Sequence, residues 1–265
     1  MKFAKGHGTG NDFVIVPDPD GVLDLTPELV AALCDRRRGI GGDGVLRVVR
    51  EGDGWFMDYR NADGSLAEMC GNGARVFVRY LLDNGLDAGS PIPIRTRAGD
   101  VVARVEDEIA VGLQLPRVYG ESTATLDTGT HAGVAVDIGN PHLVCAVPDV
   151  SALDLTSAPI VDPDLFPNGT NVEFVEGLGS PRVRMRVHER GVGETLSCGT
   201  GAGAVAAVAL RALGADTGTV TVDVPGGRLT VTVDGEACWL AGPAVVVAYG
   251  EVDLAALVDA ALQVS

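Results

Sequence analysis

Two cysteines occupy matching positions in similar segments of the chain, MCGNGAR at residues 69–75 and SCGTGAG at residues 197–203. Glycines flank Cys70 and Cys198 at a predicted strand-to-helix turn, so each thiol and several backbone N–H groups should point to the same place. A helix N-terminus lowers a thiol pKa from its free value of about 8.5. It also binds anions such as carboxylates. The pattern predicts two ionisable thiols, each beside an anion-binding turn.

Two such thiols fit the inversion of a carbon next to a carboxylate. That reaction needs a base on one face, an acid on the other, and donors that stabilise the negative charge of the planar intermediate. A thiolate and a thiol can supply both groups and exchange roles with the direction of reaction. Nucleophilic hydrolysis is the competing thiol chemistry, but it needs one cysteine paired with a histidine and leaves the second cysteine unexplained.

The surroundings of the two cysteines are repeated as well. Cys70 and Cys198 lie 128 residues apart, and the same offset aligns Asn61 with Glu189. GNDFVIV at 10–16 aligns with GNPHLVC at 139–145, and RAGDVVARV aligns with PGGRLTVTV. Four matches in one order indicate an internal duplication.

The predicted elements follow the same repeat. Residues 182–187 alternate as a strand, and a helical pattern follows each cysteine, ending near Gly85 in the first half. Further helices are predicted to start at Thr26 and near Val252. Three more segments complete the interpretation: β-hairpins at 96–115 and 222–242, and a polar linker at 116–131.

These elements predict an α/β (α+β) protein of two pseudo-symmetric domains. Each domain is expected to be a curved, mainly antiparallel sheet or barrel around a central helix. We place the N-terminal half at 1–117, joined by a C-terminal helix at 252–265, and the C-terminal half at 118–251. The active site is expected in the cleft between the halves.

Composition excludes several partners. The 265 residues carry a formal net charge of −16, so nucleic acid and anionic membranes would be repelled. The one basic cluster, Arg36–Arg38, is short and is predicted to complement a helix C-terminus. The N-terminus lacks the apolar core of a secretion signal, and the chain has no long apolar run, so a cytoplasmic location is expected.

The other cysteines and the lysines argue against bound cofactors. Five cysteines without a CxxC pair favour neither a disulfide scaffold nor a zinc site, and we expect no metal. Cys34, Cys145 and Cys238 are predicted to be buried core residues. Lys2 and Lys5 are the only lysines, which argues against a pyridoxal phosphate Schiff base.

The motifs together resemble the diaminopimelate epimerase family, cofactor-independent enzymes that convert LL-2,6-diaminopimelate into the meso form. The resemblance spans essentially the whole chain. It is carried by HGTGNDFV at 7–14, DRRRGIGGDGVL at 35–46, NADGSLAEMCGNGAR at 61–75, GNPH at 139–142, NVEF at 171–174, HERGVGETLSCGTGAGA at 188–204 and the terminal GPAVVVAYGE.

The resemblance implies a role for each matching residue. Cys70 and Cys198 are the acid/base pair, and the backbone amides of Gly71, Asn72, Gly199 and Thr200 hold the reacting carboxylate. The remaining amino and carboxylate groups of the substrate are expected to contact Asn11, Asn61, Asn140, Asn171, Glu189 and Arg190. His142 and Glu189 are candidates for tuning the thiols. Gly44 departs from the pattern, because some family members carry a substrate-contacting glutamine there.

Three alternatives remain open at this stage. The chain also resembles proline racemase and the phenazine-biosynthesis isomerases, which look like relatives built on the same duplicated fold. Racemisation of another free amino acid would use the same mechanism. A protein whose two cysteines cycle between dithiol and disulfide, or a silent binding module, belongs to a different class. The resemblance also implies a homodimer. His7 and His188 are predicted to be structural, and His131 to be solvated.

Overall fold

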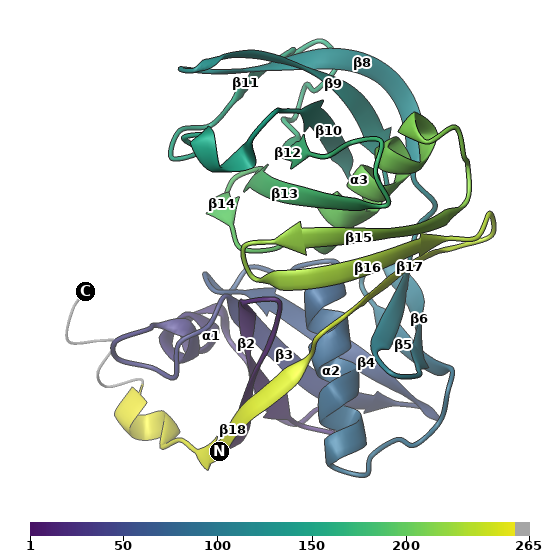
Figure 1. Cartoon of the computed structure of the whole chain (residues 1–265). Helices are drawn as coiled ribbons and strands as arrows, with labels where there is room; N and C mark the ends of the chain where they lie inside the picture. The colour runs from purple at the N-terminus through teal and green to yellow at the C-terminus, as the bar shows by residue number, and fades with distance from the viewer. Residues whose placement is uncertain (258–265) are drawn as a thin grey trace. The chain divides into compact units, whose positions relative to one another are not determined.

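The structure is a computed structural model that describes residues 1–257, and it divides into two compact units (Figure 1). Unit 1 comprises Met1–Val111 and the chain from Ala244 onward, and unit 2 comprises Gly112–Pro243. No helix in the described part is long and apolar enough to cross a membrane. Each unit contains a series of paired strands and its own buried helix.

Unit 1 holds one sheet in the order β18-β1-β2-β3-β4-β5-β6-β7. The β2–β3 and β4–β5 pairs are parallel and the others are antiparallel. The strands are β1 (Lys2–Gly8), β2 (Asn11–Pro17), β3 (Gly44–Glu51), β4 (Gly54–Asn61), β5 (Ile92–Thr96), β6 (Gly99–Val105), β7 (Ile109–Leu113) and β18 (Val245–Glu251), and the helices are α1 (Pro27–Cys34) and α2 (Gly71–Asp83).

Unit 2 repeats this order of pairings as β8-β9-β10-β12-β13-β15-β16-β17, again with the third and fifth pairs parallel. Two short strands add to it, β11 on β8 and β14 on β13. The elements are β8 (Arg117–Leu126), β9 (Gly129–Asp137), β10 (Pro141–Ala146), η1 (Val150–Ala152), β11 (Ile160–Val161), β12 (Asn171–Glu176), β13 (Arg182–Glu189), β14 (Gly193–Thr195), α3 (Gly199–Ala212), β15 (Gly218–Val224), β16 (Gly227–Val233) and β17 (Cys238–Gly242).

The matching pairings confirm the predicted fold of two pseudo-symmetric halves. In each half the sheet surrounds one buried helix, α2 or α3, and Figure 1 shows α2 lying against the strands of its own unit. Apolar side chains make these contacts; Phe77 and Leu81 of α2, for example, are fully buried against Ile15 and Met57. Burying each large apolar side chain stabilises the fold by about 1.5–3 kcal/mol, so this packing fixes the helix in its sheet.

The observed division differs from the predicted boundaries after residues 117 and 251. It falls after Val111 and Pro243, because β18 pairs with β1 and so belongs to unit 1. In its pairing with β1, β18 takes the place that β8 takes beside β9. The duplicated fold therefore completes its first half with a strand from the end of the chain.

Two smaller predictions were wrong. Residues 116–131 are not a linker but lie mostly in the β8–β9 hairpin, whose largely exposed, polar positions hide the strand pattern. Arg36–Arg38 do not complement a helix C-terminus, since α1 ends at Cys34. Arg36 instead forms ion pairs with Asp12 and Asp43.

The expected C-terminal helix lies partly outside the described residues. Residues 254–257 are helical, and Leu257 is buried with Val30 and Leu33 of α1 in a small apolar cluster of unit 1. This contact places the start of the segment against the first half of the fold. Residues 258–265 lie outside the described chain.

A buried carboxylate ties three strands of unit 1 together. Asp58 of β4 is 3% exposed and forms ion pairs with Arg47 of β3, Arg60 of β4 and Arg97 beyond β5. Burial alone would raise the pKa of Asp58, but hydrogen bonds from Arg60 and Arg97 lower it overall. The ionised carboxylate therefore stabilises the folded unit.

We predict that Asp58→Asn lowers the free energy of unfolding by about 3–5 kcal/mol, because it leaves buried arginines without their anion. The depressed pKa means that this stabilisation is present at neutral pH and is lost as the pH falls below about 4. Urea denaturation at neutral and acidic pH measures both effects. Asp100→Asn, at an exposed position of β6, is the control. Equal stability of the two variants at neutral pH would contradict the prediction.

Candidate active site

Cys70 is the N-cap of α2. Its extended backbone, with φ −139° and ψ 118°, turns the chain into the helix, and its Sγ accepts the N–H of Gly73 at 3.4 Å. The first N–H groups of a helix have no preceding turn to accept them, so those of Gly71 and Asn72 are suited to an anion. The thiol and these amides therefore share one helix end.

The β1–β2 turn supports this helix end. Thr9 has a φ of 50°, which is rare for a β-branched residue, and it is buried. Its hydroxyl lies 3.4 Å from the Asn72 side-chain oxygen. Asn11, at the start of β2, has its side-chain oxygen 3.5 Å from both the Cys70 Sγ and the Asn72 Nδ2. The structure thus brings together four predicted residues, Asn11, Cys70, Gly71 and Asn72.

Asn61 ends β4, opposite Gly44 of β3, and its side chain donates to Ser65 at 3.0 Å. A Cβ at Gly44 would lie 2.4 Å from the backbone oxygen of Arg60 and 2.8 Å from the Tyr59 ring. No side chain fits at position 44 without a shift of the neighbouring strand. The space beside Gly44 is therefore closed by β4 itself.

Cys198 is the N-cap of α3 and repeats the geometry of Cys70. Its φ is −118° and its ψ 118°, and its Sγ accepts the N–H of Gly201 at 3.4 Å. The Thr200 hydroxyl lies 3.6 Å from the same sulfur and also accepts from the Asn140 amide at 3.4 Å. The second thiol thus stands beside the amides of Gly199 and Thr200.

A fully buried histidine–glutamate pair lies next to this turn. His142 Nδ1 is 2.7 Å from the Glu173 carboxylate, and its Nε2 is 3.1 Å from the Asn140 side-chain oxygen. A Cβ at Gly201 would lie 2.6 Å from the same carboxylate, so only glycine lets Glu173 approach the helix end. Glu173 was not predicted as a site residue. The feature that could have identified Glu173 is its charge within the buried strand β12.

The end of β13 carries the remaining polar residues of unit 2. Glu189 accepts a short hydrogen bond from the Thr195 hydroxyl. Burial raises the pKa of Glu189, although hydrogen bonds from Thr195 and Cys198 lower it in part. The Asn171 side chain accepts from the Arg190 backbone N–H at 2.9 Å, and the exposed Arg190 guanidinium reaches the Asn168 carbonyl.

The thiol of Cys198 does not titrate as the helix position suggests. Burial raises its pKa well above the usual value, and the charges of Glu189 and Glu173 raise it further. Hydrogen bonds from Thr200 and Gly201 lower the pKa, but they are the smaller effects. The expectation that the helix N-terminus lowers this pKa was therefore wrong, because burial and two carboxylates outweigh the helix end.

The remaining cysteines lie in the core, and three further histidines lie in strands. Cys34, Cys145 and Cys238 are buried, and burial raises the pKa of each to about 12. His131 is half-buried in β9 with its ring centroid 5.5 Å from that of Phe174, so the prediction that it is solvated was wrong. His7 and His188 lie within β1 and β13.

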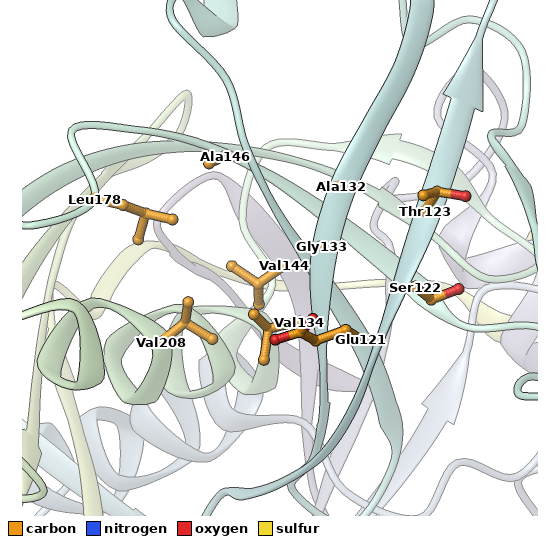
Figure 2. A pocket seen from close by; sticks show the side chains of 10 residues that line it. All are labelled: Glu121, Ser122, Thr123, Ala132, Gly133, Val134, Val144, Ala146, Leu178 and Val208. Carbon is orange, nitrogen blue, oxygen red and sulfur yellow. The ribbon is translucent and has the colours of Figure 1, made fainter.

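Unit 2 also contains an open pocket of about 520 Å³ between the β8–β9–β10 sheet and α3, which Figure 2 shows from close by. Its wall is mainly apolar, with Val134, Val144 and Val208 facing the space and Glu121 at its edge. None of the predicted site residues lines it. The pocket therefore provides none of the acid/base groups discussed above. Within residues 1–257, no group of three metal-ligating side chains is placed to hold a metal ion.

Comparison with known proteins assigns the family. The family model described as diaminopimelate epimerase matches residues 3–115 and 134–254. The chain belongs to the diaminopimelate epimerase family. A diaminopimelate epimerase of Rhodococcus opacus (strain B4) is 50% identical over 96% of this chain and 97% of its own. One from Thermobifida fusca (strain YX) is 50% identical over 97% of this chain and 100% of its own.

Solved structures share the fold of this diaminopimelate epimerase family member. A phenazine biosynthesis protein of the PhzF family from Bacillus anthracis superposes with a TM-score of 0.73 at 19% identity, covering 95% of this chain and 98% of that one. A hydroxyproline epimerase from Agrobacterium vitis has a TM-score of 0.63 at 17% identity, covering 94% and 91%. At these identities the likeness shows the duplicated fold alone.

We predict that iodoacetamide at mildly alkaline pH leaves Cys34, Cys145 and Cys238 unmodified in the folded protein, because each thiol is buried and protonated. Peptide mass spectrometry after short labelling measures the modification. Labelling in urea is the control, where all of them should react. Rapid labelling of Cys145 in the folded protein would contradict the prediction.

Proposed function

We propose that this protein converts LL-2,6-diaminopimelate into the meso form without a cofactor, by a two-thiol mechanism. The observation that carries the proposal is the pair of helix ends: Cys70 and Cys198 each cap the buried helix of one unit with the same backbone geometry. The family match supports the substrate. We further propose that the two helix ends face one another across a cleft between the units.

The reaction would proceed by one proton removal and one proton delivery. The carboxylate at the reacting centre binds the first-turn amides of α2 and α3, which also stabilise the negative charge that develops. One cysteine, as thiolate, takes the α-proton and becomes a thiol. The other, as thiol, gives its proton to the opposite face and becomes a thiolate. The configuration is inverted and the total protonation of the pair is unchanged.

The second amino-acid group of the substrate would be read by the polar residues around each helix end. The Arg190 guanidinium is suited to the distal carboxylate, because its planar fork binds a carboxylate through two hydrogen bonds. Glu189 can balance an ammonium group. The side chains of Asn11, Asn61, Asn140 and Asn171 would complete this recognition.

His142 and Glu189 would act on the second thiol rather than on the substrate alone. Glu189 raises the pKa of Cys198, and His142 is fixed by Glu173 and Asn140 beside the same turn. These contacts favour a neutral thiol at Cys198 when the site is empty.

Several further properties rest on the family resemblance. The proposed reaction belongs to the synthesis of lysine and of peptidoglycan precursors, and we place it in the cytoplasm. We also propose a homodimer. The alternatives are the racemisation of another amino acid, such as proline, and a non-catalytic thiol pair, and the first assay below separates them.

We predict exchange of the substrate α-proton with deuterium together with inversion, in heavy water, without metal or pyridoxal phosphate. Cys70→Ser and Cys198→Ser should each lower the epimerisation rate by about 100-fold or more, because each removes one proton-transfer group. Proton NMR and the LL-to-meso ratio measure the two processes. Cys34→Ser is the matched control. Exchange with proline but not with diaminopimelate would transfer the proposal to a racemase, and no exchange with any amino acid would leave the non-catalytic alternative.

We predict that Arg190→Lys lowers kcat/KM for diaminopimelate by about tenfold or more, because lysine cannot form the two-hydrogen-bond contact with a carboxylate. Steady-state kinetics measure the loss. Arg184→Lys, an exposed arginine on β13 that pairs with Glu176, should leave kcat/KM unchanged. An unchanged kcat/KM in Arg190→Lys would exclude Arg190 from substrate recognition.

A further inference from the structure

Arg75 is a buried cation at the start of the second turn of α2, without a carboxylate partner. Its side chain is fully buried, and within the described residues no carboxylate lies within ion-pair distance of its guanidinium. Its hydrogen bonds go to neutral groups: the Gly71 carbonyl at 3.3 Å, the Asn72 side-chain oxygen at 2.9 Å and the Thr9 hydroxyl at 3.5 Å. The Nε atom is buried without a partner. Isolated buried charges are costly, so this one requires an explanation.

The same position in unit 2 carries no charge. The offset between the two cysteines aligns Arg75 with Gly203, and the alignment of residues 10–16 with 139–145 places Thr9 of the β1–β2 turn opposite Ile138 of the β9–β10 turn. A Cβ at Gly203 would lie 2.5 Å from Ile138, so an apolar side chain occupies this space in unit 2. The guanidinium and its polar partners are thus a feature of the Cys70 half alone.

The carboxylates show the opposite asymmetry. Glu173 pairs with Val144 in the parallel β10–β12 ladder, and the matching place in the β2–β3 ladder, opposite Ile15, holds Leu46. The glycines whose N–H groups bond to the two sulfurs show the same difference. A Cβ at Gly201 would meet Glu173, whereas a Cβ at Gly73 would meet Leu46 at 3.2 Å.

Likewise, Glu189 at the end of β13 aligns with Asn61 at the end of β4. Cys198 is therefore surrounded by Glu173, Glu189 and the His142 bonded to Glu173, from three strands. The corresponding strand positions around Cys70 are occupied by uncharged residues.

We propose that the free enzyme carries its single negative charge on Cys70, that Arg75 is the buried positioning residue that holds it there, and that Cys198 rests as the protonated thiol. The inference rests on the proposed two-thiol reaction. The cation interacts favourably with an ionised Cys70, and Glu108 in the β6–β7 turn is the only other charge that acts on it appreciably among the described residues. Burial lowers the pKa of Arg75 only to about 10, so the guanidinium stays charged at neutral pH.

Arg75 also positions the helix end. Its bonds to the Gly71 carbonyl and the Asn72 side chain hold the turn whose amides and thiol are to meet the carboxylate. Thr9, held in its unusual backbone conformation, completes this contact. One buried side chain therefore sets both the charge and the geometry of one half of the site, without reaching the substrate.

The test is a titration of each thiol in the absence of substrate. Cys198→Ser protein reports Cys70, and Cys70→Ser protein reports Cys198, which removes any coupling between the two. Iodoacetamide modification of each peptide is followed by mass spectrometry across pH. We expect the midpoint of Cys70 below the free value of about 8.5 and that of Cys198 above it. Equal midpoints, or the reverse order, would overturn the proposal.

Variants of the cation test its role. In the Cys198→Ser background, Arg75→Met should raise the Cys70 midpoint by about one to three pH units, and Arg75→Lys should shift it less because it keeps a cation. Arg79→Met, on the same helix and paired with Asp83, is the control and should shift nothing. A Cys70 midpoint unchanged by Arg75→Met would overturn the role of Arg75.

A complementary variant covers the case in which Arg75→Met does not fold. Glu173→Gln in the Cys70→Ser background should lower the Cys198 midpoint toward the free value, and an unmoved midpoint would overturn the proposed asymmetry. Because no substrate is present, these results are independent of the exchange assay. Absence of epimerisation with the expected midpoints would reject the proposed function alone. Epimerisation with equal midpoints would reject this inference alone.

Discussion

The cap at the start of each buried helix is the contact on which the rest of the site depends. Serine, threonine, aspartate and asparagine are the usual residues at this position, and here a cysteine thiol accepts the N–H of the third helical residue instead. That residue is a glycine in both units. At Gly201 any side chain would collide with Glu173. The thiol, the amides of the first turn and the neighbouring strand are therefore fixed as one group.

The duplication preserved this backbone and changed the electrostatics around it. The strands of both units repeat the same order of eight, including two parallel pairs. The two helices therefore begin at equivalent positions relative to their strands. Around Cys70 the fold buries a guanidinium, and around Cys198 it places the buried Glu173 and His142 and the half-buried Glu189. Two thiols with equal surroundings would have similar pKa values, whereas unequal surroundings favour ionisation of one thiol over the other.

Periodicity and turn residues were enough to predict the two helix starts, the hairpins after them and the duplication. The sequence did not reveal β8, because its exposed face is polar and its pattern resembles a loop. It also did not assign β18 to unit 1, since pairing between the two ends of a chain leaves no local signal. Glu173 and Arg75 lie in motifs that resemble the family, but neither was predicted as a residue of the site.

The sequence by itself determined which atoms we propose for the chemistry: two cysteines before glycine-rich helix starts, and the polar residues aligned with them. These residues can be identified from local patterns, because each motif lies within one short segment of the sequence. Only the tertiary structure decided the direction of the Cys198 pKa shift, because a pKa depends on burial and on charges brought from other strands. The position of Cys198 at a helix end predicts a lowered pKa, and the packing of Glu173 and Glu189 around it produces a raised one.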